Sequence, residues 1–215
     1  QDHLEHSSDM PKAFKTFKMR TAYPGIDANL DAYTSPEGHR QHHRRRLQDF
    51  IEKPSTKKNL WKVGFAVLPG LLGPLEVESL LEELPHYVPD GPAVNMDRQS
   101  KGSGEYIYLE QLPSQLSSLK EVAYETFRPL ADELMQQHYC ELEAVGKFDG
   151  RKANIHQRLP NTLCEFEQLC DRSGQTDPSD LLIGYEEGGS NSKHRDIYGE
   201  VSFPLQMVLL LSRPE

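Results

Sequence analysis

Apolar and polar residues alternate in a short stretch near residue 63, and this pattern predicts a β-strand. Val63, Phe65 and Val67 fall on one side of an extended chain, because successive side chains of a strand point to opposite faces. Pro69 and Gly70 follow as a turn. We therefore expect the folded part of the chain to begin with a half-buried strand.

Three later stretches have the period of a helix with one apolar face. They cover about residues 77–84, 116–142 and 162–172. Pro129 lies inside the second stretch and is expected to kink or divide it. Asn161 is placed to cap the third stretch. The apolar stripe of the second stretch is expected to pack on a sheet.

The last part of the chain predicts strands. Residues 180–185 read as a short strand, and Gly188 and Gly189 mark a turn. Residues 201–211 form an apolar run that is typical of a buried strand. The expected order is therefore a strand, a turn, a short polar segment and a second strand.

The polar segment contains His194 and Asp196, which are two residues apart. In an extended segment their side chains leave on the same face. An imidazole and a carboxylate both suit ferrous iron, and with a second histidine they make a facial triad that leaves coordination positions open. The pair alone is a weak signal in an acidic chain with 9 histidines, but its position between a turn and an apolar run strengthens it. We take His194 and Asp196 as candidate metal ligands.

A series of motifs around this pair resembles the core of the iron(II)- and 2-oxoglutarate-dependent dioxygenases. The similar subfamily has His-x-Asp-x-Tyr-Gly, then Phe-Pro-Leu-Gln and an aliphatic strand, and the resemblance covers roughly Trp61 to the C-terminus. The residues that carry it are His194, Asp196, Tyr198, Gly199, Phe203, Pro204, Leu205, Gln206, the run Gly64 to Gly70, and Gly104, Glu105 and Tyr106.

This resemblance implies a fold and a chemistry. The fold is expected to be α+β, a double-stranded β-helix (jelly-roll) braced by helices, with only the N-terminal part of the sandwich present. The implied cofactors are Fe(II), 2-oxoglutarate as cosubstrate and dioxygen, and the implied reaction is hydroxylation of a C–H bond. The subfamily has been described as acting oxidatively on alkylated DNA bases, which implies demethylation of nucleic acid bases. Small molecules and protein side chains stay open as substrates.

Two tyrosines are candidate cofactor-binding residues by the same resemblance. Tyr185 precedes His194 by nine residues, a spacing similar to that of a tyrosine that contacts 2-oxoglutarate in prolyl-hydroxylase-like relatives. The alternative is a strand tyrosine that packs its ring and hydrogen-bonds its hydroxyl. Tyr106 belongs to a motif that recurs near the active site of the subfamily, and the alternative is a simple edge strand after a turn.

Two parts of the family pattern have no counterpart. The second iron-binding histidine and the basic residue that pairs with 2-oxoglutarate belong on later strands, but no histidine follows His194 and the sequence ends at Glu215. His86, His138 and His156 fall in segments that predict helix or linker, and we expect them at the surface. We expect a fragment of a longer dioxygenase. The alternative is a pseudoenzyme that acts as a binding module.

The first sixty residues differ in charge from the rest. Residues 1–60 contain 11 Lys and Arg against 8 Asp and Glu, whereas residues 61–215 contain 13 against 25. We expect residues 1–60 to be an irregular, locally basic extension of an incomplete dioxygenase-like domain at residues 61–215. Arg44, Arg45 and Arg46 form a basic run that suits contact with nucleic acid or a nuclear address. A solvated helix start or a linker is the alternative.

Composition limits the class of protein. With 215 residues and 36% hydrophobic residues, a single soluble domain is expected. The longest apolar run, residues 207–211, is too short to cross a bilayer, and no charged and then apolar leader opens the chain. Cys140, Cys164 and Cys170 have no metal-knuckle spacing, so a reducing compartment is expected. We expect an intracellular protein, cytoplasmic or nuclear, without a membrane partner.

Overall fold

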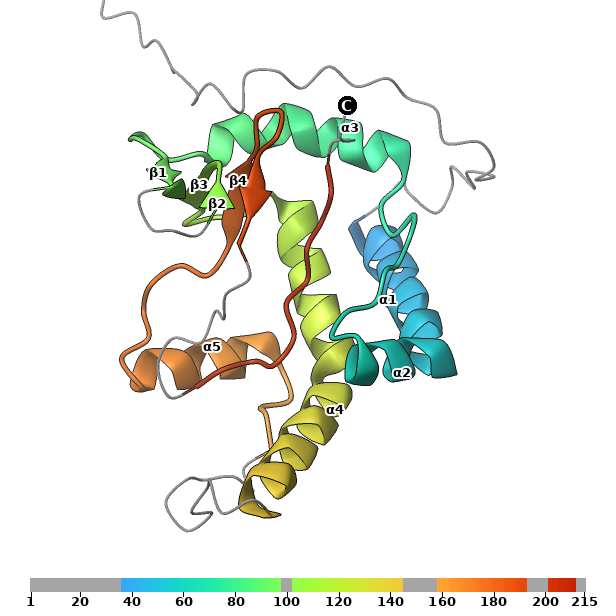
Figure 1. Ribbon diagram of the computed structural model, residues 1–215. Coiled ribbons are helices and arrows are strands. Elements are labelled where there is room, and N and C mark those ends of the chain that lie inside the picture. The colour runs from blue at the N-terminus through green and yellow to red at the C-terminus, as the bar shows by residue number, and fades with distance from the viewer. Residues whose placement is uncertain (1–35, 98–101, 145–157, 193–200, 212–215) are drawn as a thin grey trace, which may run out of the picture.

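The computed structural model describes residues 36–97, 102–144, 158–192 and 201–211. In this part of the chain, helices surround one long central helix, and two small antiparallel sheets lie at one end of it (Figure 1). The helices are α1 (Pro36–Glu52), α2 (Pro54–Lys62), α3 (Pro74–Glu83), the 3-10 helix η3 (Leu84–Tyr87), α4 (Ser114–Ala144) and α5 (Leu163–Arg172).

The strands form two separate sheets. The three-stranded sheet has the order β1 (Val94–Asn95), β3 (Glu105–Tyr108) and β4 (Leu181–Gly184), and the two-stranded sheet pairs β2 (Gly102–Ser103) with β5 (Ser190–Asn191). All three pairings are antiparallel. The strand predicted at residues 180–185 is thus confirmed, whereas β3 is the middle strand of its sheet and not an edge strand.

Proline and capping residues set where several helices begin. Pro54 and Pro74 lie at the first positions of α2 and α3, where a missing N–H costs no helix hydrogen bond. The Thr162 hydroxyl accepts a 3.3 Å hydrogen bond from the Glu165 N–H, and the Glu165 carboxylate accepts one of 3.2 Å from the Thr162 N–H. The expected cap at Asn161 was therefore wrong by one residue.

The helices predicted in the middle of the chain are confirmed as α3, α4 and α5. Helix α4 continues through Pro129, which does not divide it. Leu119 and Val122 on α4 are fully buried, and they form one core cluster with Leu47 of α1 and Leu71. A second cluster joins Leu84, Ile107 and Leu109 under the three-stranded sheet, and partly buried Leu116, Leu182 and Leu211 pack against it.

The expected irregular extension at residues 1–60 differs from the structure where it can be compared. Residues 36–62 form α1 and α2, and Leu47 of α1 belongs to the main core cluster. The prediction missed α1 because one of its buried positions is polar: His43 is as buried as Leu47, one helical turn away. Residues 1–35 lie outside the described residues.

Two predicted strands are also absent from the described part of the chain. Val63, Phe65 and Val67 are all more than half exposed, and α2 extends to Lys62. Residues 201–211 run as an elongated segment along α4 toward α3 without a described strand partner (Figure 1). Leu209 and Leu211 pack on the two core clusters, whereas Val208 and Leu210 face outward. The two-residue alternation of a strand is present, but the ladder of hydrogen bonds is not.

No described helix combines the length and the apolar character that a membrane span requires.

Candidate functional site

The two candidate metal ligands, His194 and Asp196, lie outside the described residues, as does His156. The structure instead describes what holds the chain on either side of the pair. On the N-terminal side this is strand β5, and on the C-terminal side it is the backbone of Val201.

Strand β5 is held against β2 by close backbone packing. Ser190 pairs with Ser103, and Asn191 pairs with Gly102. Gly102 has a φ of +131°, and a Cβ built there would lie 2.1 Å from the Ser190 carbonyl oxygen. Only glycine fits such an approach. The β2–β5 pair therefore fixes the chain three residues before His194.

The turn between β4 and β5 is the one predicted from its glycines. Gly188 has a φ of +77°, in the left-handed region, and the Gly189 N–H donates a 2.8 Å hydrogen bond to the Glu186 carbonyl. A Cβ at Gly189 would lie 2.9 Å from the Ser103 carbonyl oxygen. The turn thus packs directly on β2.

On the C-terminal side, Gln175 holds the backbone of Val201. The Gln175 Nε2 donates a 2.8 Å hydrogen bond to the Val201 carbonyl, and the Val201 N–H donates one of 2.8 Å to Gln175 Oε1. A carboxamide carries a donor and an acceptor, so it pairs with one residue as a neighbouring strand would. Sequence patterns gave no signal for this contact, because Gln175 is in the loop after α5.

Tyr106 and Tyr185 come together on one face of the three-stranded sheet. Tyr106 pairs with Ile183 in the β3–β4 register, and Tyr185 follows two residues after Ile183, on the same face. Tyr106 is 9% exposed and meets Tyr108 edge to face, with 5.6 Å between ring centroids. Tyr185 is 44% exposed. Its ring covers Gly104, where an added Cβ would lie 2.9 Å from Tyr185 Cδ1.

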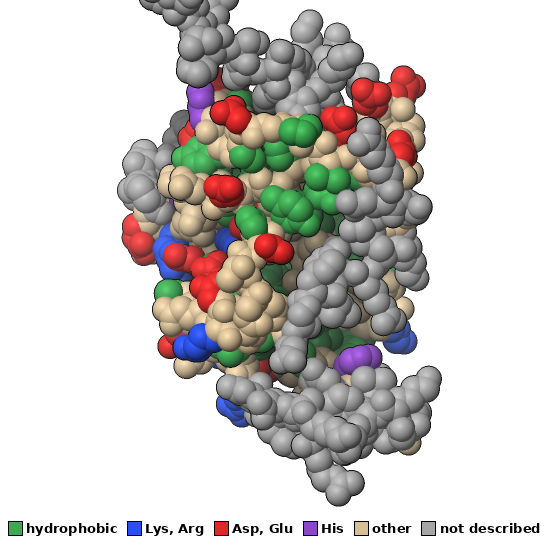
Figure 2. Space-filling model, turned by 90° about the vertical axis from the view of Figure 1, so that its left-hand side faces the viewer, with side chains coloured by type: hydrophobic (Ala, Val, Ile, Leu, Met, Phe, Trp, Pro, Cys, Tyr) green, Lys and Arg blue, Asp and Glu red, His purple; other side chains and the backbone are tan. Residues whose placement is uncertain are grey.

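Hydrophobic side chains gather on the side of the molecule that carries the strands, with acidic side chains around them (Figure 2). Leu181, Tyr108 and Tyr185 are among the exposed large hydrophobic residues. This side therefore presents apolar and aromatic surface within an acidic surround.

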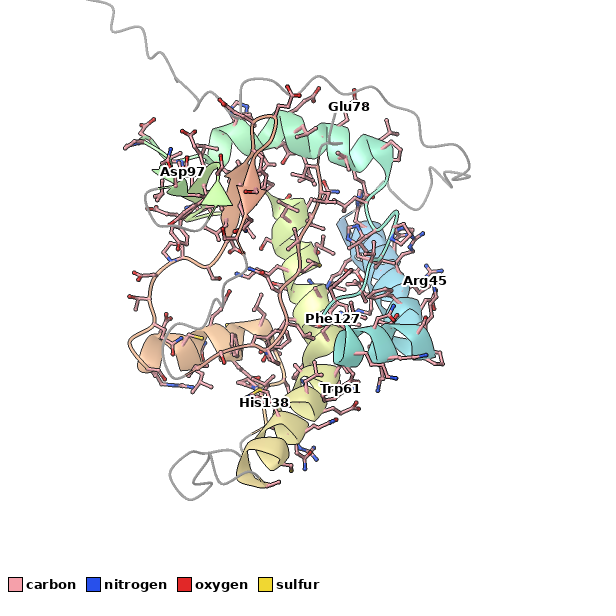
Figure 3. The ribbon with its side chains drawn as sticks, in the orientation of Figure 1. Arg45, Trp61, Glu78, Asp97, Phe127 and His138 are labelled. Carbon is pink, nitrogen blue, oxygen red and sulfur yellow. The ribbon has the colours of Figure 1, made fainter. Side chains whose placement is uncertain are left out.

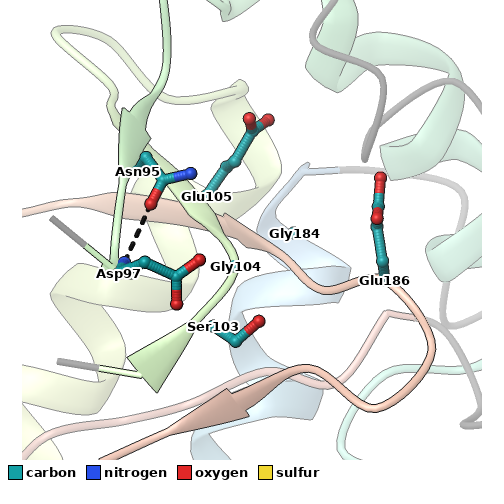
Figure 4. A pocket seen from close by; sticks show the side chains of 7 residues that line it. All are labelled: Asn95, Asp97, Ser103, Gly104, Glu105, Gly184 and Glu186. Atoms are coloured by element: carbon teal, nitrogen blue, oxygen red, sulfur yellow. Dashed lines mark hydrogen bonds between the residues drawn. The ribbon is translucent and has the colours of Figure 1, made fainter. Parts of the chain in front are cut away.

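A small pocket opens at the ends of the strands (Figure 4). Its cavity has a volume of about 130 Å³, and the side chains of Asp97, Glu105 and Glu186 line it together with Asn95. The Asn95 Oδ1 is already engaged, because it accepts a 2.8 Å hydrogen bond from the Asp97 N–H. Among the described residues, the charged side chains that line the pocket are all acidic.

Within the described ranges, no group of three or more histidine, cysteine, aspartate or glutamate side chains is arranged to hold a metal ion. His86 and His138 are exposed, as expected, and His138 is labelled on α4 in Figure 3. The described residues therefore hold no complete metal centre of their own.

The basic run is largely engaged within the protein. Arg44 donates a 2.7 Å hydrogen bond to Glu125 on α4, and Arg46 donates one of 2.9 Å to the Pro69 carbonyl. Arg45 is exposed and lies on the side of α1 that faces away from α4 (Figure 3). Arg44 and Arg46 are thus partly buried and engaged within the protein, and Arg45 is the exposed member of the three.

A buried polar cluster was missed by the sequence analysis. Glu76 of α3 lies between α1 and α4: its Oε1 is 3.1 Å from His43 Nε2 and 3.1 Å from His39 Nδ1, and it accepts a 3.1 Å hydrogen bond from Gln115. Its Oε2 accepts a 2.6 Å hydrogen bond from the Gly73 N–H. The signal was the spacing of His39 and His43, which places both on one face of a helix.

Burial alone would raise the pKa of Glu76, but the hydrogen bonds from His43 and from the Gly73 N–H outweigh it and lower that pKa to about 2. The carboxylate is therefore ionised over the whole physiological range. It joins three helices, so we regard it as part of the scaffold and not of the site.

The comparisons with known proteins concern the part of the chain that carries the strands. Residues 104–215 match the model of a family described as an oxygenase catalysing oxidative methylation of damaged DNA. The match covers more than half of the chain. The chain belongs to this oxygenase family. No solved structure matches it.

Two curated relatives of this chain are proteins of two strains of Mycobacterium tuberculosis, both described as uncharacterized and designated MT2286 and Rv2227. Each is 33% identical over 84 residues, which is 39% of this chain and 36% of the relative. The chain thus spans about a third of the length of the curated relatives it matches.

The matched range of the oxygenase family starts at Gly104 and includes β3, β4, β5, α4 and α5, together with Gln175, Tyr185, His194 and Asp196. Helices α1, α2 and α3 lie before it. The residues that match the family therefore lie on the side of the molecule that carries the strands and on the long helix α4.

Proposed function

We propose that this protein is an iron(II)- and 2-oxoglutarate-dependent oxygenase that acts on alkylated bases of damaged DNA. The observation that carries the proposal is the family match, whose range contains the pair His194 and Asp196. The family description supplies the oxygenase class and damaged DNA. The donor set of the pair is compatible with ferrous iron.

An imidazole and a carboxylate are suitable donors for ferrous iron. The same donors also bind zinc, so the choice of iron rests on the oxygenase class of the family. His194 and Asp196 would hold the ion together with a third protein ligand. Bound iron with 2-oxoglutarate would supply the activation of dioxygen that hydroxylation of a C–H bond requires. The chain itself has to orient the ligands, bind the cosubstrate and exclude water.

In this proposal Tyr185 is the cosubstrate residue, and Tyr106 supports it. Tyr185 exposes its side chain at the edge of the sheet, five residues before the β5 strand that leads to His194. Its hydroxyl can donate a hydrogen bond to a carboxylate of 2-oxoglutarate. Tyr106 is buried on the same face of the sheet. Its ring would therefore form the base of the surface on which Tyr185 lies. The aromatic surface also suits stacking on a base that has left the duplex.

We also propose that the described strands belong to a double-stranded β-helix braced by the helices. The support is the alternation in residues 201–211, where Leu209 and Leu211 pack inward while Val208 and Leu210 point outward. This is how a strand covers a helical layer with one face and presents the other to a second sheet. Slow hydrogen exchange at alternate amides of residues 207–211 in the full-length protein would support it, and uniformly fast exchange would contradict it.

The activity is tested by turnover of 2-oxoglutarate in the full-length protein supplied with Fe(II). His194→Ala and Asp196→Ala should each lower succinate formation by at least about 100-fold, because each removes a metal ligand. His86→Ala and Asp177→Ala are matched controls at exposed positions, and they should stay within about two-fold of the unsubstituted protein. Turnover that survives in both ligand variants would show that the metal site lies elsewhere.

The substrate is tested with single-stranded oligonucleotides that carry one N-methylated base. Loss of the methyl group, followed by mass spectrometry, should depend on Fe(II), 2-oxoglutarate and dioxygen, and an unmodified oligonucleotide should not stimulate succinate formation. If 2-oxoglutarate turns over but no methylated base is altered, the result supports the proposed oxygenase class and contradicts the proposed DNA substrate.

A further inference from the structure

The segment from Ser192 to Glu200 is held at both ends by contacts that the structure describes. Before it, Asn191 pairs with Gly102 in the β2–β5 sheet. After it, the backbone of Val201 forms two hydrogen bonds, both of 2.8 Å, with the side chain of Gln175. His194 is three residues from the first anchor, and Asp196 is five residues from the second.

The second anchor depends on one side chain, and that side chain is itself fixed. Gly174 has a φ of +76° and ends α5, and the Gln175 N–H then donates a 2.9 Å hydrogen bond to the Cys170 carbonyl. The carboxamide therefore projects from a defined helix end. Two residues after Val201, the ring of Phe203 packs against Tyr124, with 5.1 Å between centroids. Val201 is thus held by Gln175, and the chain beyond it by the surface of α4.

We propose that Gln175 is a positioning residue of the iron site, because it fixes the C-terminal end of the segment that carries both ligands. This inference rests on the proposed function. An extended chain spans at most about 3.6 Å per residue, so the Cα of Asp196 stays within about 18 Å of the Cα of Val201. Fixing both ends of a segment removes much of the conformational entropy that metal binding would otherwise cost.

The chemistry of the clamp is specific to glutamine. Glutamate in its place has no donor for the Val201 carbonyl, and asparagine has the same carboxamide on a side chain one methylene shorter. Methionine has nearly the shape of glutamine and neither group. The series Gln175→Met, Gln175→Glu and Gln175→Asn therefore separates the loss of the hydrogen bonds from the loss of side-chain volume. Gln168→Met on α5 is the matched control, because Gln168 is exposed.

The experiment uses the full-length protein and Mn(II) as a probe that does not turn over. Mn(II) binding is followed by electron paramagnetic resonance, hydrogen exchange of the Val201 amide by mass spectrometry, and the melting temperature is recorded alongside. Gln175→Met should exchange the Val201 amide at least about 10-fold faster and bind Mn(II) at least about 10-fold more weakly. Gln175→Asn should restore part of both, and Gln168→Met should change neither.

The outcomes separate the two proposals. If the unsubstituted protein does not bind Mn(II), the proposed metal site fails, and the role of Gln175 fails with it. If the unsubstituted protein binds Mn(II) and Gln175→Met frees the Val201 amide without weakening Mn(II), Gln175 is a structural clamp only and the inference is overturned. A Val201 amide that exchanges equally slowly in Gln175→Met overturns it as well, because the clamp is then not what holds the segment.

Discussion

The helical layer comprises α1 to α4, and the strand side comprises β1 to β5 with residues 201–211. The two regions differ in how deeply their hydrophobic side chains are buried. The helical layer contains fully buried side chains such as Leu47, Leu80, Leu119 and Leu130. On the strand side, Tyr108, Tyr185 and Leu210 are among the exposed large hydrophobic residues. Trp61 and Leu75 of the helical layer are exposed as well, and Ile107 of the strand side is buried, but the fully buried large side chains are concentrated in the helical layer.

The family match starts at Gly104, so it covers the strand side from β3 onward together with helix α4, whereas α1, α2 and α3 lie before it. Ion pairs join helices α1 and α2 to α4. Arg40 pairs with Glu121 and Glu125, Arg44 with Glu125, and Lys57 with Glu133. The strand side carries the family motifs on short strands and loops. Sites that bind ligands commonly lie in such less stable regions, supported by a rigid scaffold.

The largest expected effect comes from removing a core side chain on one side and an exposed one on the other. Leu119→Ala should lower the free energy of unfolding by about 4 kcal/mol, because Leu119 is fully buried and its loss leaves a cavity. Leu210→Ala should change it by less than about 0.5 kcal/mol, because Leu210 is 84% exposed. Urea denaturation measures both. Equal effects would show that the strand side is covered in solution.

The buried polar cluster is the next most sensitive point of the helical layer. Glu76→Ala should lower the free energy of unfolding by about 3 kcal/mol, because His39, His43, Gln115 and the Gly73 N–H lose a shared acceptor. Glu78→Ala is the matched control at an exposed position of the same helix and should stay within about 0.5 kcal/mol. A loss for Glu76→Ala no greater than for the control would mean that the cluster does not join the helices.

Acid should weaken the helical layer through the same carboxylate. The pKa of Glu76 is about 2 in the folded protein against an ordinary glutamate value of 4.5, so the unfolded chain binds the proton more readily. The stabilisation is therefore complete above about pH 4.5 and is lost as the pH falls toward 2. Melting temperatures measured from pH 6 to pH 3 should fall less steeply in Glu76→Gln than in the unsubstituted protein. Parallel curves would contradict the lowered pKa.

Local patterns predicted the elements whose stability comes from their own sequence. Helices α3, α4 and α5 and strand β4 have clear periods, and the turn at Gly188 has the residue that a positive φ requires. Helix α1 was missed because His43 and Glu76 satisfy each other across helices, and no single stretch of sequence records such a partner. The strands at residues 63–67 and 201–211 were predicted from alternation alone, but a strand also needs a neighbour.

The candidate site divides in the same way. Tyr106 lies on β3 and Tyr185 directly follows β4, so the sheet brings the two candidates to one face. The sequence analysis gave each as a candidate cofactor-binding residue and did not place them relative to each other. Gln175 could not be predicted, because its role depends on meeting the backbone of Val201, 26 residues away. The iron ligands His194 and Asp196, the cofactors and the jelly-roll remain predictions.

A smaller effect is expected where the two regions meet. Tyr124 of α4 donates a 2.8 Å hydrogen bond to the Pro160 carbonyl, and its ring contacts Phe166 and Phe203. Burial raises the pKa of Tyr124 to about 12. Tyr124→Phe keeps the ring contacts and should cost about 1 kcal/mol of the free energy of unfolding, because the Pro160 carbonyl loses its donor. Tyr185→Phe should lower the free energy of unfolding by less, because the ring of Tyr185 is about half exposed. A larger loss for Tyr185→Phe than for Tyr124→Phe would place the stabilising contact on the strand side.

The smallest effect on stability is expected at Arg45, where the helical layer meets solvent. Arg44→Ala removes the contact with Glu125 and should lower the melting temperature slightly, whereas Arg45→Ala should leave it unchanged. For binding of single-stranded DNA the order reverses. Arg45 is exposed, so its loss should reduce the slope of log affinity against log salt by about 0.7, the value for one phosphate contact to a single strand.

This pair of substitutions decides whether the helical layer takes part in the function of the strand side. Fluorescence anisotropy with a labelled oligonucleotide at several salt concentrations measures the slope, and Lys58→Ala, at an exposed position of α2, is the control for general charge. A slope that changes for Arg45→Ala and for Lys58→Ala alike indicates only diffuse attraction. A slope that changes for neither shows that Arg45 and Lys58 make no phosphate contact.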